Sequence, residues 1–421
     1  MNKYNHSNLS NKSNLFVIPD SGAKTATALF IFRTGSRYEN KQNNGISHFL
    51  EHMFFKGSKK YPNTLSLSSA LDALGCEFNA FTSKEYTGYY IKAAASKLGK
   101  ALDILGDMML NPKLDAKEIK REKGVIIEEL NMYRENPMMH IDDVLENCLY
   151  GNTPAGWDIV GTKDNINNFK RADFISYYAN QYGGESANLI LAGEINKQFV
   201  VRAEKILQKL NKGNFKQQVG VVENQKKPQI RALYKNIDQT VLSLAVRTFP
   251  INHKEEITAK MLALILGGSM SSRLFINLRE RKGLAYFIKT NTEFYSDTGY
   301  LSTQAGVPFE RTKEAVSIIL NEYRRLKTSL VGKEELQKIK DIMEGHIMMQ
   351  MEASDNLANW YGRQAIMRSK VMTPSDFLKM VNKITSQDLQ KTARRIFVSS
   401  GLNLALIGRV KNKDFIEMLK I

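Results

Sequence analysis

Two histidines and a glutamate form the most reactive cluster visible in the sequence. His48, Glu51 and His52 lie in the stretch HFLEH, although the 421 residues contain only six histidines. On a helix, residues four apart lie on one face, so both imidazoles can point at one ion. Glu51 directly precedes the second histidine and projects beside the same ion. Two imidazoles, a carboxylate and an open fourth position are the ligand set of a hydrolytic zinc site.

The spacing of this motif has two interpretations. H-x-x-E-H is the reverse of the H-E-x-x-H zinc-protease motif and is the inverzincin signature. A five-residue match can also arise by chance, and a histidine in an apolar helix more often packs in the core than binds metal. The motif alone therefore leaves both a zinc hydrolase and a packed helix open.

A third ligand is expected from another helix, because the motif places only two nitrogen ligands on one face. The predicted helix 115–135 contains Glu118, Glu122, Glu128 and Glu129. Glu122 and Glu129 are seven residues apart, which is two turns on one face. One could bind the metal while the other supports the site. Periodicity does not choose between Glu128 and Glu129, and solvated helix-surface acids would give the same pattern.

The elements that must position these residues are predicted from periodicity and turn residues. The motif helix is expected over about 45–55, and a hairpin over 76–94 turns near 83–85. Other helices are predicted at 62–74, 95–110, 115–135, 139–150, 166–180, 196–211, 254–267, 271–281, 310–328, 333–352, 355–369, 375–382 and 386–397. Other strands are predicted within 15–33 and 230–248, and at 187–193, 284–294, 299–306 and 401–408.

The two halves of the chain resemble each other. NLILAGEI at 188–195 matches NLALIGRV at 403–410, and the run beginning at Thr25 matches the run beginning at Thr240. Both matches have the same offset, which indicates an internal duplication. The predicted fold class is therefore α+β, with two homologous domains, each an antiparallel-rich sheet covered by helices. The second copy reads AKMLALILGGSM at 259–270, so only the first half carries the metal motif.

Composition changes set the expected domain boundaries. A polar, Asn/Ser-rich flexible arm is predicted over residues 1–14, followed by the zinc-binding domain at 15–211. Residues 212–229 lose the periodicity and form a predicted linker. The homologous domain without metal covers 230–421.

Composition also excludes several classes of protein. No apolar run reaches the roughly 18 residues that span a bilayer, and the first 14 residues lack the apolar core of a signal peptide. Cys76 and Cys148 are interpreted as small core residues without a disulfide, which fits a reducing compartment and a cytoplasmic location. The net charge is +17, but the lysines are dispersed and no arginine-rich tract is present. A solvated surface is favoured over nucleic-acid binding.

These motifs resemble the pitrilysin/insulinase zinc peptidases, the family that includes mitochondrial processing peptidase. In that family a liganding Glu follows the inverted motif after about 76 residues, with a supporting Glu seven residues earlier. On this chain those positions are Glu129 and Glu122. The resemblance implies one Zn²⁺ per chain bound by His48, His52 and Glu129, with Glu51 as general base on zinc-bound water.

Two further stretches resemble the same family. The first is the strand made of Asn79, Ala80, Phe81 and Thr82. It is similar to an N-A-[YF]-T-S edge strand that pairs with the substrate backbone. The second is the pair Arg279 and Tyr286, similar to an R-x6-Y element that binds substrate and stabilises the oxyanion. An ordinary hairpin strand, a surface arginine and a sheet tyrosine are the structural alternatives.

The resemblance implies a function and an assembly. We expect a zinc metalloendopeptidase, like a processing peptidase, that hydrolyses peptides or extended leader segments inside a clamshell chamber. The chain is expected to form a homodimer in which Arg279 and Tyr286 act in trans on the partner's zinc site. The alternative is a non-catalytic structural subunit of the same fold, and the intact ligand set argues against it.

Overall fold

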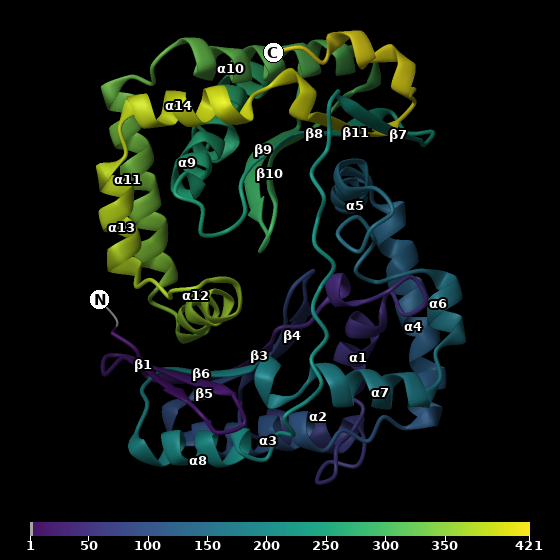
Figure 1. Cartoon of the computed structure of the whole chain (residues 1–421), viewed down its shortest axis with the longest axis vertical. Helices are drawn as coiled ribbons and strands as arrows, with labels where there is room; N and C mark the ends of the chain where they lie inside the picture. Colours follow the sequence, from purple (N-terminus) through teal and green to yellow (C-terminus); the bar gives the residue numbers. More distant parts are fainter. Residues whose placement is uncertain (1–2) are drawn as a thin grey trace. The chain divides into compact units, whose positions relative to one another are not determined.

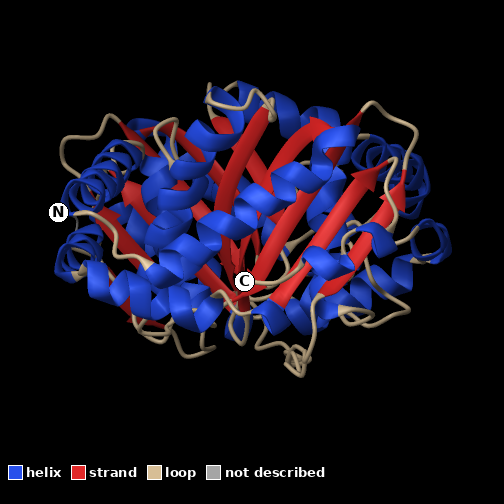
Figure 2. Ribbon diagram, turned by 90° about the horizontal axis from the view of Figure 1, so that it is seen from above, coloured by secondary structure: helices blue, strands red, loops and turns tan. Residues whose placement is uncertain are grey.

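The computed structural model describes residues 3–421 and divides into two compact units (Figure 1). Unit 1 comprises the residues up to Leu130 together with Trp157–Val219 and His346–Ser375. Unit 2 comprises Asn131–Gly156, Gly220–Gly345 and Asp376–Ile421. Each unit is built on its own mixed sheet, with helices packed against it (Figure 2). This confirms the predicted α+β class and the duplication.

Unit 1 contains a six-stranded sheet in the order β1-β2-β6-β3-β5-β4. Its strands are β1 (Asn5–Asn8), β2 (Asn14–Pro19), β3 (Thr25–Phe32), β4 (Glu77–Thr82), β5 (Thr87–Ala94) and β6 (Ala187–Gly193). The β2–β6 pair is parallel and the other pairs are antiparallel. The central strands β3 and β6 are almost entirely buried, because both faces of the sheet are covered. β4 lies at the sheet edge.

Helices cover both faces of this sheet. Unit 1 includes α1 (Ile46–Phe54), α2 (Thr64–Asp72), α3 (Leu98–Leu110), α6 (Lys163–Asn168), α7 (Arg171–Gln181), α8 (Lys197–Leu207) and α12 (Ser354–Met367). Figure 1 shows α3 and α8 on one face and α12 on the other. A Cβ added at Gly362 would lie 2.9 Å from Leu29 Cδ2, so a small residue is needed where α12 crosses β3.

The five-stranded sheet of unit 2 has the strand order β7-β11-β8-β10-β9, which corresponds to β2-β6-β3-β5-β4 in unit 1. The strands are β7 (Gln229–Tyr234), β8 (Gln239–Arg247), β9 (Phe287–Phe294), β10 (Gly299–Pro308) and β11 (Leu402–Gly408). Helix α4 (Ala116–Glu135) belongs to unit 1 as far as Leu130 and ends in unit 2. The remaining helices are α5 (Pro137–Tyr150), α9 (Glu256–Gly267), α10 (Thr312–Thr328), α11 (Lys333–Gln350), α13 (Pro374–Lys383) and α14 (Ser386–Ile396). α5 packs against β8 and β11, and α9 packs against β9 and β10.

The compact units are discontinuous in sequence. α5 comes from the first half of the chain but belongs to unit 2, whereas α12 comes from the second half and belongs to unit 1. The ranges 15–211 and 230–421, predicted as the two duplicated domains, are continuous in sequence and stay a prediction. Residues 211–227 contain no helix or strand, and β7 begins at Gln229.

Several local features differ from the expected elements. Of the arm expected over residues 1–14, residues 1 and 2 lie outside the described part, and Asn5–Asn8 form β1. The ring of His6 stacks on Phe16 with centroids 4.4 Å apart, which holds this polar strand against β2. The helix predicted at 271–281 is a short π-helix, η4 (Phe275–Glu280). Across residues 3–421, every helix is too short or too polar to cross a membrane. Both cysteine thiols are free.

A buried ion pair holds the turn of the β4–β5 hairpin. The Arg37 guanidinium donates to the Glu85 carboxylate, and both side chains are almost fully inaccessible to solvent. The backbone N–H groups of Ser36 and Arg37 also donate to the carbonyl oxygens of Ser83 and Lys84, at 3.3 and 2.9 Å. The end of β4 is therefore tied to the segment that follows β3.

We predict that Glu85→Ala destabilises the protein strongly. Removing Glu85 takes a carboxylate partner away from a buried guanidinium, which costs about 3–5 kcal/mol. The free energy of unfolding, from chemical denaturation, checks this. The control is Glu185→Ala, which breaks the exposed Lys12–Glu185 pair and should change that free energy by at most about 1 kcal/mol. Equal effects of the two variants would contradict a stabilising role of the buried pair.

Candidate metal centre

Three predicted ligands converge in unit 1. The ligand atoms of His48 and His52 on α1 and of Glu129 on α4 all lie within 4.8 Å of one another. His48 Nε2 is 3.6 Å from Glu129 Oε1, and His52 Nε2 is 3.4 Å from Glu129 Oε2. Ligand atoms around a tetrahedral zinc ion are separated by about 3.3 Å, so this donor set fits zinc. Glu128 is exposed and does not belong to the cluster.

The start of α1 is held by a distant carboxylate. The backbone N–H groups of Gly45 and Ser47 each donate to Glu39, at 2.8 Å, and satisfy donors that a helix start leaves unpaired. Gly45 has φ of 101°, and a Cβ there would lie 2.5 Å from Val160 O. This turn therefore requires glycine. The apolar face of α1 is buried, which directs the face carrying His52 toward α4.

A second carboxylate supports His52 from behind. Glu122 Oε1 lies 3.0 Å from His52 Nδ1, and Lys56 Nζ lies 2.7 Å from Glu122 Oε2. An ionised carboxylate only accepts hydrogen bonds, so His52 Nδ1 carries a proton and Nε2 faces the cluster. His48 Nδ1, in contrast, is buried without a hydrogen-bond partner among the described residues. The two imidazoles are therefore supported unequally.

The electrostatics of the cluster follow from these contacts. Burial lowers the pKa of His52, but hydrogen bonds to Glu122 and Glu129 and their charges outweigh it and raise that pKa to about 9. Burial raises the pKa of Glu129, but hydrogen bonds to His48 and His52 hold it far below its usual range. The pKa of Glu122 is also lowered, despite burial, by His52 and Lys56. Without metal, a proton on His52 provides the positive charge that these carboxylates attract.

Glu51 lies on α1 beside the cluster but outside the ligand group. Its Oε2 accepts a hydrogen bond of 2.5 Å from the Thr82 hydroxyl at the end of β4. A cleft of about 270 Å³ opens next to it. The cleft is lined by Glu51, His52, Phe55, Lys56, Phe78, Asn79, Ala80 and Glu122. The edge strand, Glu51 and the metal-ligand candidate His52 therefore border the same space.

Comparison with known proteins places this chain in a family. Residues 15–163 match the family model described as insulinase (peptidase family M16), and residues 168–343 match the model of the M16 inactive domain. A Bacillus subtilis protein named an uncharacterized zinc protease, YmxG, is 32% identical over 378 residues, covering 89% of this chain and 90% of that protein. The chain belongs to peptidase family M16.

Other relatives of the M16 chain cover most of its length. An uncharacterized zinc protease of Rickettsia bellii is 30% identical, covering 90% of this chain and 91% of that protein. The human mitochondrial-processing peptidase subunit beta is 27% identical, covering 93% and 82%. The crystal structure of a Helicobacter pylori protease matches with a TM-score of 0.91 at 21% identity, covering 97% and 99%, which supports the fold.

Arg279 and Tyr286 of the M16 chain belong to unit 2. The Arg279 guanidinium lies over the Phe275 ring, 5.0 Å from its centroid. The Tyr286 side chain is 77% exposed, and its backbone N–H donates to Gly306 O at 3.2 Å. The action of Arg279 and Tyr286 at a metal site stays a prediction.

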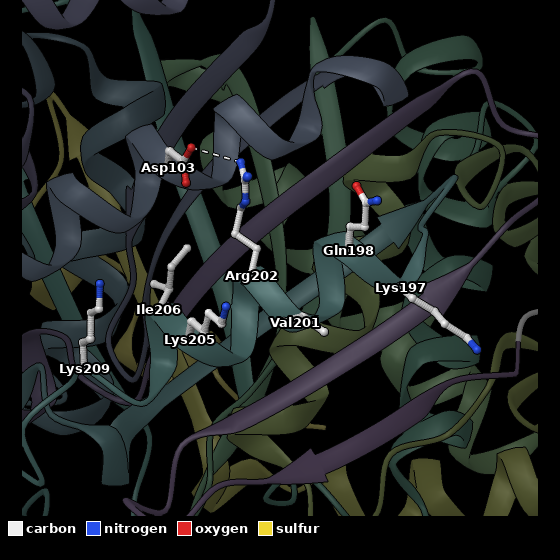
Figure 3. A pocket seen from close by; sticks show the side chains of 8 residues that line it. All are labelled: Asp103, Lys197, Gln198, Val201, Arg202, Lys205, Ile206 and Lys209. Atoms are coloured by element: carbon white, nitrogen blue, oxygen red, sulfur yellow. Dashed lines mark hydrogen bonds and ion pairs between the residues drawn. The ribbon is translucent and has the colours of Figure 1, made fainter.

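A second hollow in unit 1 has a different chemistry. It occupies about 610 Å³ between α3 and α8 (Figure 3). It is lined by Asp103, Lys197, Gln198, Val201, Arg202, Lys205, Ile206 and Lys209. Its one carboxylate, Asp103, is paired with Arg202 at 3.0 Å. The lining carries four basic side chains and one acidic side chain, so the hollow is predominantly basic.

Two supporting residues of the M16 chain were missed by sequence reasoning. Lys56 lies four residues after His52, on the face that the motif itself defines, so the helical period could have indicated it. Glu39 lies before the helix whose start it holds, and no local spacing indicates that contact. Both act through other residues and not on the metal directly.

We predict that zinc binding releases a proton from His52. A metal ligand must be a neutral imidazole, whereas His52, with a pKa of about 9, is protonated at pH 7 in the metal-free protein. Zinc affinity should therefore rise with pH up to about 9, and about one proton should be released per zinc at pH 7. Calorimetric titration in buffers of different ionisation enthalpy measures both.

The matched variant for this prediction is Glu122→Gln. It removes a contact that raises the pKa of His52, so fewer protons should be released at pH 7. Zinc should also bind about 10–100-fold more weakly, because the support of the ligand is lost. A zinc affinity that does not change between pH 6.5 and pH 8.5 would contradict the protonated state assigned to His52.

Proposed function

We propose that this M16 chain is a zinc-dependent endopeptidase that hydrolyses peptides or extended leader segments. The observation that carries the proposal is the convergence of His48, His52 and Glu129, with His52 and the neighbouring Glu51 lining one cleft. These three residues would hold the zinc ion. Zinc bound there would acidify a water molecule and polarise the scissile carbonyl.

Glu51 is proposed as the general base. It takes a proton from the attacking water and then delivers it to the leaving amine. Its position on α1, directly before His52, places its carboxylate at the cleft and outside the ligand group. A base of this kind needs access to water, which the open cleft provides.

The edge strand β4 is proposed to bind the substrate backbone. Within the described sheet, β4 pairs with β5 on one side, and its other side is a sheet edge. An extended peptide can add to such an edge through backbone hydrogen bonds. Asn79 and Ala80 line the cleft, so a peptide on this edge would pass Glu51. An extended backbone is the shape of an unfolded peptide or a leader segment.

The relatives' names support a peptidase. Several are called zinc proteases, and one is a subunit of mitochondrial-processing peptidase. The alternative, a non-catalytic structural subunit of the same fold, has no need for a complete donor set beside an open cleft. The match of residues 168–343 to an inactive-domain model agrees with the absence of the H-x-x-E-H motif from that range.

The proposal extends to a homodimer that encloses a chamber. In it, Arg279 and Tyr286 of one chain stabilise the oxyanion at the site of the partner. The high exposure of the Tyr286 side chain leaves its hydroxyl available for such a contact.

We predict that Glu51→Gln retains zinc and fold but loses most turnover. The amide cannot take the proton, so kcat should fall by about 10²–10⁴-fold. Mass spectrometry of products from a peptide library, with and without a chelator, measures cleavage by both proteins. Cleavage at the parental rate would refute the general-base role. Absence of cleavage by the zinc-loaded parent would favour the structural-subunit alternative.

We also predict complementation in mixed dimers. A Glu51→Gln subunit retains Arg279 and Tyr286, whereas an Arg279→Ala subunit retains Glu51. If these residues act in trans, one of the two sites in the mixed dimer is complete, and activity should rise above that of either parent variant. The two subunits carry different affinity tags, so that mixed dimers are purified before the assay. Verified mixed dimers without recovered activity would contradict action in trans.

A further inference from the structure

We propose that the Thr82 side chain is a positioning residue for Glu51 and not a contact to the substrate. This inference rests on the proposed function, because it gives Glu51 the role of base. Thr82 is the last residue of β4, and its hydroxyl donates to Glu51 Oε2 at 2.5 Å. A hydroxyl has one hydrogen to donate, and here that hydrogen is used within the protein.

The donor is held at a defined place. The turn after Thr82 is closed by the Ser83 N–H, which donates to Tyr86 O at 2.8 Å. The buried pairing of Arg37 with Glu85 ties this turn to the segment following β3. The tip of the hairpin is therefore anchored on the protein side, and the Thr82 hydroxyl is fixed before any peptide binds.

The acceptor, the Glu51 carboxylate, is held less firmly than the donor. Glu51 is a half-buried residue of α1 and lines an open cleft. Without the hydrogen bond from Thr82, the Glu51 side chain would rotate about several bonds. Aligning its carboxylate for the reaction would then cost conformational entropy. With Oε2 engaged by Thr82, the carboxylate plane is oriented and Oε1 remains for the attacking water. A displacement of about 1 Å in such a group can reduce the rate about 100-fold.

Alternation along β4 separates this role from substrate binding. Phe78, Ala80 and Thr82 lie on one face of the strand, and Asn79 and Phe81 lie on the other. Backbone pairing of a peptide at the strand edge uses N–H and C=O groups and does not require the Thr82 hydroxyl. Removal of that hydroxyl should therefore affect the chemical step and leave peptide binding intact.

The test compares Thr82→Val, which removes the hydroxyl at constant shape, with Thr82→Ser, which retains it. In Thr82→Val, kcat should fall about 10–100-fold, while KM stays within about twofold of the parent. Thr82→Ser should restore kcat to within about threefold of the parent. Zinc content and the thermal unfolding midpoint should match the parent in both variants. An increase in KM with unchanged kcat, or equal losses in both variants, would overturn the proposal.

Two measurements do not depend on turnover. Peptide affinity is compared between Glu51→Gln and Glu51→Gln/Thr82→Val, and equal Kd values are expected. Weaker binding by the double variant would show that Thr82 contacts substrate and would overturn the proposal. Crystal structures of the parent and Thr82→Val should show one Glu51 conformer and several, respectively. An unchanged Glu51 conformer in Thr82→Val would also overturn it.

These experiments distinguish a failure of the proposed peptidase function from a failure of the proposed Thr82 role. If the zinc-loaded parent cleaves no peptide, the peptidase function fails, and the conformers of Glu51 still decide whether Thr82 orients it. If the parent is active and Thr82→Val is equally active, the peptidase function stands and the positioning role fails. Thr82→Ala serves as a second hydroxyl-free variant if valine disturbs the strand.

Discussion

The candidate site depends on the attraction between two imidazoles of α1 and two carboxylates of α4. Glu122 and Glu129 are two turns apart on one face of α4, and His48 and His52 are one turn apart on α1. The carboxylates of α4 face the imidazoles of α1, although the two helices are far apart in the sequence. Where the metal is absent, a proton on His52 provides the positive charge. Metal binding and helix pairing therefore use the same residues.

Unit 2 has a similar arrangement without the charged residues of the metal site. It has the same strand order as unit 1, but its helix α9 is buried around most of its circumference. With the offset of the matched segments, Ala263, Leu266 and Gly267 stand where α1 has His48, Glu51 and His52. A helix this largely apolar is stabilised mainly by packing and needs no ion. Duplication thus conserved the sheet while one helix face changed its chemistry.

Local periodicity accounts for the parts of the structure that the sequence could predict. The helix at 46–54, the hairpin that carries Thr82 and the duplicated strands all follow repeats of two or about four residues. The exchange of α5 and α12 between the units could not be predicted, because it depends on which sheet a helix contacts far away in sequence. β1 was missed since its residues are polar and its pairing relies on the ring of Phe16. Periodicity also left Glu128 and Glu129 equivalent. The family spacing points to Glu129, and in the structure it is Glu129 that lies beside His48 and His52.

Rigidity is distributed unevenly around the cleft. The hairpin tip rests on the buried Arg37–Glu85 pair, and the start of α1 rests on the Glu39 carboxylate. Both contacts involve polar side chains removed from solvent, where an unpaired partner is costly. The strand edge and the base are therefore held by contacts within the protein. Along β4 the Ala80 N–H donates to Asn79 Oδ1 at 2.8 Å, so a peptide that paired with this N–H group would have to replace that bond. A substrate would then lose its own conformational freedom on binding, while the protein has already lost most of its freedom during folding.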